Sequence, residues 1–293
     1  MKKLYLIIIG VLILGAIYGL FMMDYAKPVG VENGGGAVDP FNAIYLIDGR
    51  AVKLTDKYFE SEIAPNSASK MKVLVFGEPV YGDLDNDGDE DVLLILTVDM
   101  GGSGTFYYGV VALNYPDGWR GTNAVLMGDR IAPQTNQIIN NLAIVNYAIR
   151  GEGEPISGSP SIGKSDYLYI QGGSLEQANL KNSNIFLIRP QENYTIHSPV
   201  EISGYARGNW FFEASFPVIL TDWDGKIIAE GIATAENEWM TTNFVPFKAV
   251  LNFDSPYKDG DQAFMRNGIL ILKKDNPSDL PENDDALETW VLF

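Results

Sequence analysis

Short apolar or alternating runs, separated by turn residues, fill most of the chain after residue 40. No stretch of the region 41–173 keeps a helical period over a dozen residues. We therefore predict a β-rich domain over 41–173, with short helices at most near 56–63 and 135–141. Its predicted strands are 43–47, 73–76, 91–98, 105–113, 123–127, 142–148 and 166–170.

The region 185–293 shows the same kind of pattern after a polar stretch at 174–184, which we interpret as a linker. Its predicted strands are 185–189, 200–206, 210–218, 226–234, 244–253, 268–273 and 287–293. So many short strands within about 110 residues predict an immunoglobulin-like β-sandwich, here without a disulfide.

Strand alternation also assigns faces to individual side chains in this second domain. In 210–218, Trp210 and Phe212 fall on the parity rich in large apolar residues, which predicts that both are buried. Phe211 falls on the opposite parity, as does Trp290 in the last strand. We expect Phe211 and Trp290, together with Trp223 in a turn, either to form a contact surface or to pack under loops or against the first domain.

The N-terminus has the pattern of a membrane anchor. Lys2 and Lys3 precede an uncharged apolar run at 4–23, long enough to cross about 30 Å of hydrocarbon as a helix. The alternative is a cleaved signal peptide, whose apolar region is shorter and ends in small residues. We favour an uncleaved signal anchor, a transmembrane helix within 1–23, because large residues occupy the place of a cleavage site.

Positive charge stays on the cytoplasmic side, so the anchor predicts a single-pass protein of the bacterial cytoplasmic membrane whose bulk is extracytoplasmic. Residues 24–40 contain two prolines and a glycine triplet, which predicts a flexible tether. The chain has no Cys, one His and a net charge of -17. These numbers exclude cysteine chemistry and argue against nucleic acid as a partner.

An acidic stretch in the first domain follows the pattern D-x-D-x-D-G-x-x-D. Its candidate metal ligands are Asp83, Asp85, Asp87, Asp89 and Asp91. The motif resembles the calcium loops between strands of integrin-type propellers, and the spacing lets alternate carboxylates meet at one cation while Gly88 makes the turn. Asp89 would offer its carbonyl. An EF-hand is rejected because Leu94 stands where its last ligand is required. The alternative is a solvated hairpin turn without calcium.

Three stretches of the second domain carry a family resemblance: NWFFEASFP at 209–217, WMTTNFVP at 239–246 and KDNPSDLPENDDAL at 274–287. They resemble the Gmad2 family, the immunoglobulin-like domain of bacterial sporulation and spore germination proteins, over about 185–293. The resemblance implies an extracytoplasmic domain in an anchored protein of the cell envelope. It implies no catalytic residues.

These observations favour a non-catalytic envelope protein that binds a wall polymer or another envelope protein, with calcium stiffening the first domain. One alternative is an envelope glycan hydrolase, since paired carboxylates cleave glycosidic bonds without Cys or His. The other is an inhibitor of envelope-directed enzymes, for which the loop at 101–105 is the candidate.

Overall fold

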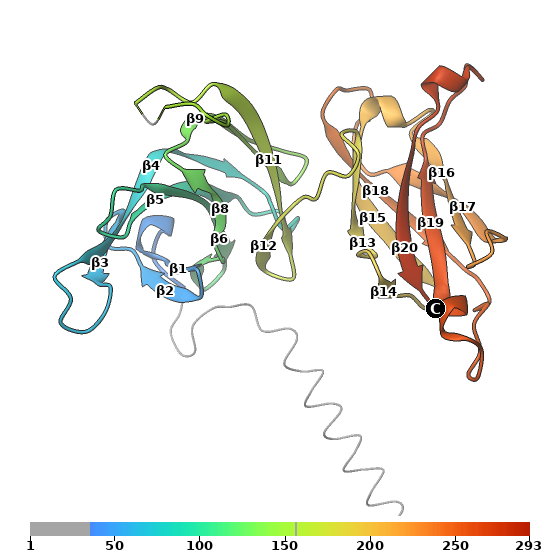
Figure 1. The fold of residues 1–293 in the computed structure, drawn as a ribbon, viewed down its shortest axis with the longest axis horizontal. Coiled ribbons are helices and arrows are strands. Elements are labelled where there is room, and N and C mark those ends of the chain that lie inside the picture. The colour runs from blue at the N-terminus through green and yellow to red at the C-terminus, as the bar shows by residue number, and fades with distance from the viewer. Residues whose placement is uncertain (1–35, 156) are drawn as a thin grey trace, which may run out of the picture. The chain divides into compact units, whose positions relative to one another are not determined.

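The computed structural model describes residues 36–155 and 157–293, which form two compact units divided between Gln177 and Ala178 (Figure 1). The predicted anchor at 1–23 and most of the tether at 24–40 lie outside the described residues. Among the residues that are described, no helix is long and apolar enough to cross a membrane. The chain is mostly β, as the sequence predicted.

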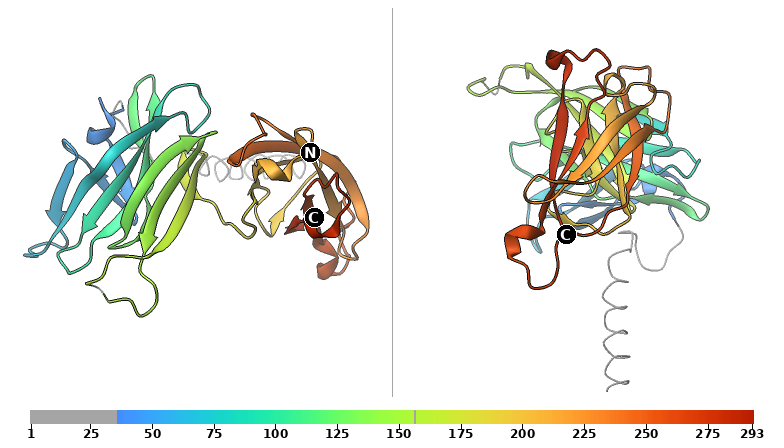
Figure 2. Two further views of the ribbon diagram at one scale, coloured as in Figure 1. Left: turned by 90° about the horizontal axis from the view of Figure 1, so that it is seen from above. Right: turned by 90° about the vertical axis from the view of Figure 1, so that its right-hand side faces the viewer.

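The first unit is built from three layers of strands. A hairpin of β1 and β2 lies on one face of a six-stranded sheet, and a four-stranded sheet, ordered β12-β11-β10-β9, lies on the other (Figure 2). A short 3-10 helix, η1 (Pro40–Asn42), precedes the hairpin. The strands are β1 (Ile44–Ile47), β2 (Arg50–Lys53), β3 (Tyr58–Glu62), β4 (Lys70–Gly82), β5 (Asp91–Asp99), β6 (Phe106–Tyr115), β7 (Gly118–Gly121), β8 (Val125–Asp129), β9 (Ala132–Ile139), β10 (Leu142–Ile149), β11 (Ile162–Gln171) and β12 (Ser174–Gln177).

Strand β5 lies at the centre of these layers, which explains its nearly continuous apolar sequence. Val92 and Leu94 point into the core beneath the β1–β2 hairpin, whereas Leu93 and Ile95 point into the core beneath the four-stranded sheet. A strand that is buried on both faces needs apolar residues at every position rather than at alternate ones. The acidic loop therefore leads, along the chain, directly to a strand that is buried on both faces.

The second unit is a β-sandwich around one core that includes Trp210, Phe216 and Phe247. Its strands follow the hydrogen-bonded order β13-β15-β18-β17-β16-β19-β20-β14, and β17 pairs with both β16 and β18. The strands are β13 (Ile185–Arg189), β14 (Tyr194–Thr195), β15 (Val200–Arg207), β16 (Ser215–Thr221), β17 (Ile227–Ala235), β18 (Phe244–Leu251), β19 (Asn267–Lys273) and β20 (Ala286–Leu292). Three 3-10 helices complete it: η2 (Gly208–Trp210), η3 (Ala263–Arg266) and η4 (Pro281–Asn283).

Three predictions about elements are wrong. The short helices predicted near 56–63 and 135–141 are the strands β3 and β9, which pair with β4 and β10. Both strands end their sheets and expose polar residues, so their sequences lack the apolar alternation of an inner strand. The linker predicted at 174–184 begins later, because β12 pairs with β11.

The face assignment of two aromatic residues is also wrong. Phe211 is buried, with 4% of its surface exposed, whereas Phe212 is 41% exposed. The strand predicted from residue 210 begins only at Ser215, because Glu213 (φ 51°) and Ala214 (φ 63°) adopt left-handed backbone conformations. This tight turn interrupts the two-residue alternation on which the assignment depended.

Candidate functional site

The acidic loop connects the antiparallel strands β4 and β5, whose last backbone pair is Gly82 with Asp91. Leu84 anchors the loop, since its side chain is buried in the core beneath the four-stranded sheet. The side-chain amide of Asn141 also donates to the backbone carbonyl of Asp83 (2.9 Å). The loop is therefore fixed at its start by apolar packing and by a hydrogen bond from a distant turn.

The structure brings together three of the five predicted ligands. Carboxylate oxygens of Asp83, Asp85 and Asp91 all lie within 4.8 Å of one another. Asp87 and Asp89 are exposed and lie outside this group, and the backbone N–H of Asp89 donates to Asp87 Oδ1 (2.9 Å). Two oxygens that bind one calcium ion at about 2.3–2.6 Å can be separated by up to about 5 Å. The spacing of the three carboxylates therefore suits such an ion.

The backbone of the loop wraps around the Asp83 carboxylate. The N–H groups of Asn86 and Gly88 donate to its two oxygens, at 2.7 Å and 3.1 Å. Both donors have left-handed backbone conformations, with φ of 65° at Asn86 and 95° at Gly88, which favours glycine at the second position. Each carboxylate oxygen accepts more than one bond, so Asp83 keeps lone pairs for a cation.

Asp91 is the innermost carboxylate of the group and is fully buried at the start of β5. The backbone N–H of Leu84 donates to its Oδ2 (2.8 Å), and that of Asn114 donates to its Oδ1 (3.0 Å). Burial raises the pKa of Asp91, while these N–H donors oppose the rise. The hydrogen bonds hold Asp91 in one orientation beneath the other two acids.

In Asp85, one carboxylate oxygen is left without a stabilising partner in the described part of the chain. Its Oδ1 is buried and has no hydrogen-bond partner among the described residues. Burial, followed by the charges of Asp91 and Asp87, raises the pKa of Asp85 to about 6. A cation placed among the three carboxylates would supply a partner for this oxygen and offset the repulsion.

Two contributors to this site come from β6 and could not be read from the acidic motif. Asn114 supplies the backbone donor to Asp91, and the neighbouring Tyr115 has a pKa raised by burial and by the charge of Asp85. They follow the motif by more than 20 residues, and only the pairing of β5 with β6 brings them close. The alternating acids in the sequence indicated the candidate ligands, whereas no pattern in the sequence indicated that Asn114 and Tyr115 lie beside them.

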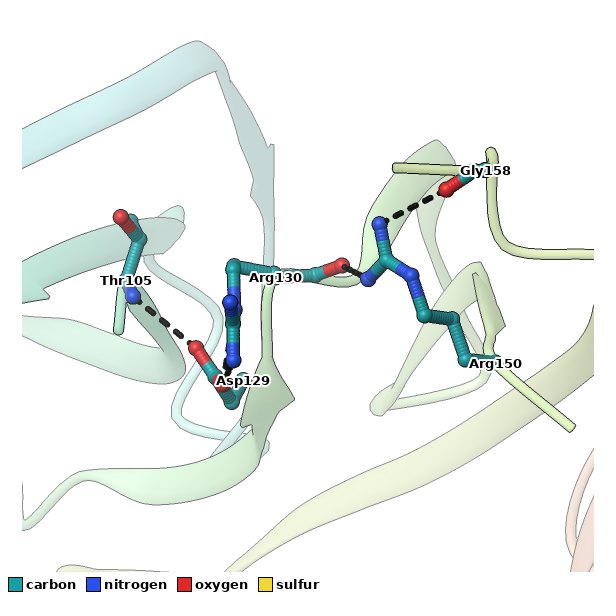
Figure 3. A network of polar contacts seen from close by, with 5 residues as sticks. All are labelled: Thr105, Asp129, Arg130, Arg150 and Gly158. Atoms are coloured by element: carbon teal, nitrogen blue, oxygen red, sulfur yellow. Dashed lines mark hydrogen bonds and ion pairs between the residues drawn. The ribbon is translucent and has the colours of Figure 1, made fainter. Parts of the chain in front are cut away.

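The loop at 101–105, the candidate for an inhibitory contact, is the hairpin connection between β5 and β6. Its end is held by the turn that follows β8. The N–H of Thr105 donates to Asp129 Oδ1 (2.9 Å) (Figure 3). The N–H of Arg130 donates to the Thr105 carbonyl (2.8 Å).

The same turn is joined to a third segment through Arg150. The guanidinium of Arg150 donates to the carbonyls of Arg130 (2.8 Å) and Gly158 (2.9 Å) (Figure 3). This arrangement links three connecting segments of the first unit, chiefly by hydrogen bonds between side chains and backbone groups. These hydrogen bonds stabilise the fold of the first unit.

Comparison with known families assigns part of the second unit. Residues 184–265 match the family model of Gmad2, described as the immunoglobulin-like domain of bacterial spore germination. No curated protein and no solved structure matches the chain. The match begins at the start of β13 and ends within η3, so it covers strands on both sides of the sandwich core. Residues 184–265 therefore belong to the Gmad2 family of immunoglobulin-like domains.

Proposed function

We propose that the chain is a non-catalytic, membrane-anchored protein of the bacterial cell envelope that acts as an extracytoplasmic binding module. The Gmad2 domain carries this proposal, because the family description links such domains to bacterial spore germination. The apolar run at 4–23 behind two lysines supports an anchor with both β units outside the cytoplasm. The partner is a wall polymer or another envelope protein.

The topology is tested by digesting intact cells, or spheroplasts where an outer membrane intervenes, with an external protease. An uncleaved anchor predicts that the bulk of the chain is digested while a small membrane-bound remnant is spared. Recovery of a soluble protein that begins near Asp24 would contradict the anchor.

We also propose that the first unit binds calcium through Asp83, Asp85 and Asp91, with the carbonyl of Asp89 as a further ligand and Asp87 contributing charge. The buried, unpartnered oxygen of Asp85 and the close approach of the three carboxylates support this role. The ion would be structural: it would tie the β4–β5 connection to the start of the buried strand β5.

Calcium binding is measured by calorimetric titration of the full-length chain. Extracellular modules bind calcium with dissociation constants of about 0.1–1 mM, so the titration has to reach millimolar concentrations. Asp85→Asn should abolish the binding heat, whereas Asp89→Asn should retain it because the carbonyl ligand is unchanged. Equal heats for wild type and Asp85→Asn would contradict the site.

A further inference from the structure

The outward surface of β16, β17, β19 and β20 in the second unit presents an apolar centre between two acids. Backbone register aligns Glu230, Ile219, Ile271 and Glu288 in one row across the four strands. The alternate residues of these strands point into the core of the sandwich, so the row faces outward. We call this surface the β16–β20 face.

The rows on either side of this central row extend the apolar surface. On one side lie Ile227, Ile269 and Trp290, whose indole is 50% exposed. On the other side lies Ile232, which is 65% exposed and pairs with Pro217. The outer face of an antiparallel sheet is ordinarily polar, so apolar side chains at most positions of these rows depart from the usual pattern and offer a contact surface.

Charge limits what this face can bind. Glu230 and Glu288 stand at the two ends of the central row, and neither forms an ion pair within the described part of the chain. Lys273 is a base at one corner of the face. The surface therefore complements an apolar group flanked by two positive charges.

Size favours a short occupant over a second copy of this chain. Neighbouring strands are about 4.8 Å apart, so Glu230 and Glu288 are separated by about 14 Å across three intervals. Three rows, spaced by two residues each, extend about 13 Å along the strands. A stable protein pair buries about 800 Å² on each side, well above the roughly 200 Å² that these dimensions enclose.

The chemistry of the face favours a peptide over a glycan. Apart from the two acids, the aligned rows offer one hydroxyl, that of Thr221, which is buried and donates to the carbonyl of Ile269 (3.4 Å). Sugar recognition needs several polar groups that fix orientation, whereas branched aliphatic side chains suit apolar side chains of a peptide. In an extended peptide, two residues four positions apart are about 14 Å apart, which matches the separation of the two acids.

We propose that the β16–β20 face binds a short, extended segment of another envelope protein in which two basic residues, four positions apart, flank an apolar residue. This inference rests on the proposed binding role and names the surface and the partner class. Glu230 and Glu288 would contact the two bases, and Ile219 and Ile271 would contact the apolar side chain between them.

The test uses the full-length chain and a fluorescent synthetic peptide with two lysines four positions apart, a leucine midway and threonines elsewhere. We expect binding that weakens as salt is added, because exposed charges are screened. The double variant Glu230→Gln/Glu288→Gln should bind about tenfold more weakly and lose most of the salt dependence. A peptide with glutamates in place of its lysines should not bind.

A matched control lies on the outer surface of the other half of the sandwich, where Val250 is 56% exposed and pairs with Glu201. The variant Glu201→Gln/Val250→Thr should bind the peptide like wild type. Equal affinity of wild type and Glu230→Gln/Glu288→Gln, or no binding at all, would overturn the proposal.

A binding assay with purified wall polysaccharide distinguishes the peptide-binding inference from the broader proposal that the chain binds the cell envelope. If polysaccharide binds in place of the peptide and Trp290→Ser abolishes its binding, the face is a glycan site and the peptide proposal is wrong. If neither probe binds while the chain still associates with envelopes, the face is wrong but the binding role stands. Loss of envelope association itself would overturn the proposed function.

Discussion

Replacing Asp85 by Asn should remove the calcium response of the first unit and part of its pH dependence. The pKa of Asp85 is raised from its ordinary 3.8 to about 6, chiefly by burial. That gap corresponds to about 3 kcal/mol at 1.36 kcal/mol per pH unit, and solvent screening of this partly exposed side chain reduces it to about 1–2 kcal/mol. The charged carboxylate therefore destabilises the folded unit when calcium is absent.

The sign follows from proton linkage. A raised pKa means that the folded state holds the Asp85 proton more tightly than the unfolded chain does. Without calcium, the stability of wild type should therefore fall as the pH rises from about 4 to about 6 and then level off. Asp85→Asn should lack this part of the fall and be more stable than wild type near pH 7.

Calcium should offset that destabilisation of the wild type. At about 10 mM calcium and a dissociation constant of about 0.1–1 mM, the bound ion stabilises wild type by about 1.4–2.7 kcal/mol. For a domain of this size, that is a rise in melting temperature of about 3–10 °C. Asp85→Asn should show no such rise, because the site loses a charged ligand.

The assay is thermal unfolding of the full-length chain, followed by circular dichroism with chelator or with calcium, at about pH 5 and about pH 7. Asp89→Asn is the matched control, since Asp89 is exposed and outside the group of three carboxylates. Identical melting curves with chelator and with calcium for wild type would refute the reasoning. So would an equal calcium response in Asp85→Asn.

Two further predictions concern the cores of the two units. Phe211→Ala should destabilise the second unit by about 3–5 kcal/mol in urea unfolding, because the ring is buried edge-on against Phe216. Phe212→Ala should cost under about 1 kcal/mol, because that ring is exposed. Equal costs for the two variants would refute this assignment of the buried ring. Tyr147→Phe should destabilise the first unit by about 1–3 kcal/mol, because its hydroxyl donates to the buried carboxylate of Asp166 (2.6 Å). An unchanged urea midpoint for Tyr147→Phe would show that another group replaces that donor.

The resemblance of three sequence stretches identified the Gmad2 family of residues 184–265. Patterning predicted the mostly β class, because inner strands carry long apolar or alternating runs. It failed at the ends of sheets. The strands β3 and β9 each pair on one side and expose polar residues, so their alternation is weak. It also failed at Phe211, because the turn at Glu213 and Ala214 depends on left-handed backbone angles that residue type alone does not signal.

At the candidate metal site, spacing identified the acidic loop but did not determine which carboxylates meet. Three of the five converge, because the loop folds around Asp83 and Asp91 is held from below by donors of Leu84 and Asn114. The second donor comes from a strand that approaches only through sheet pairing, and a local motif cannot report such a contact. The β16–β20 face also depends on register, which aligns residues of four separate strands.

The central claim, that the two β units bind a component of the cell envelope, is tested most directly by sedimentation. The fragment 24–293, which lacks the predicted anchor, is mixed with cell envelopes purified from the source organism and centrifuged. The account predicts that the fragment sediments with the envelopes saturably, is displaced by excess unlabelled fragment, and sediments less when it carries Glu230→Gln/Glu288→Gln. A fragment that remains in the supernatant at every envelope concentration would contradict the account.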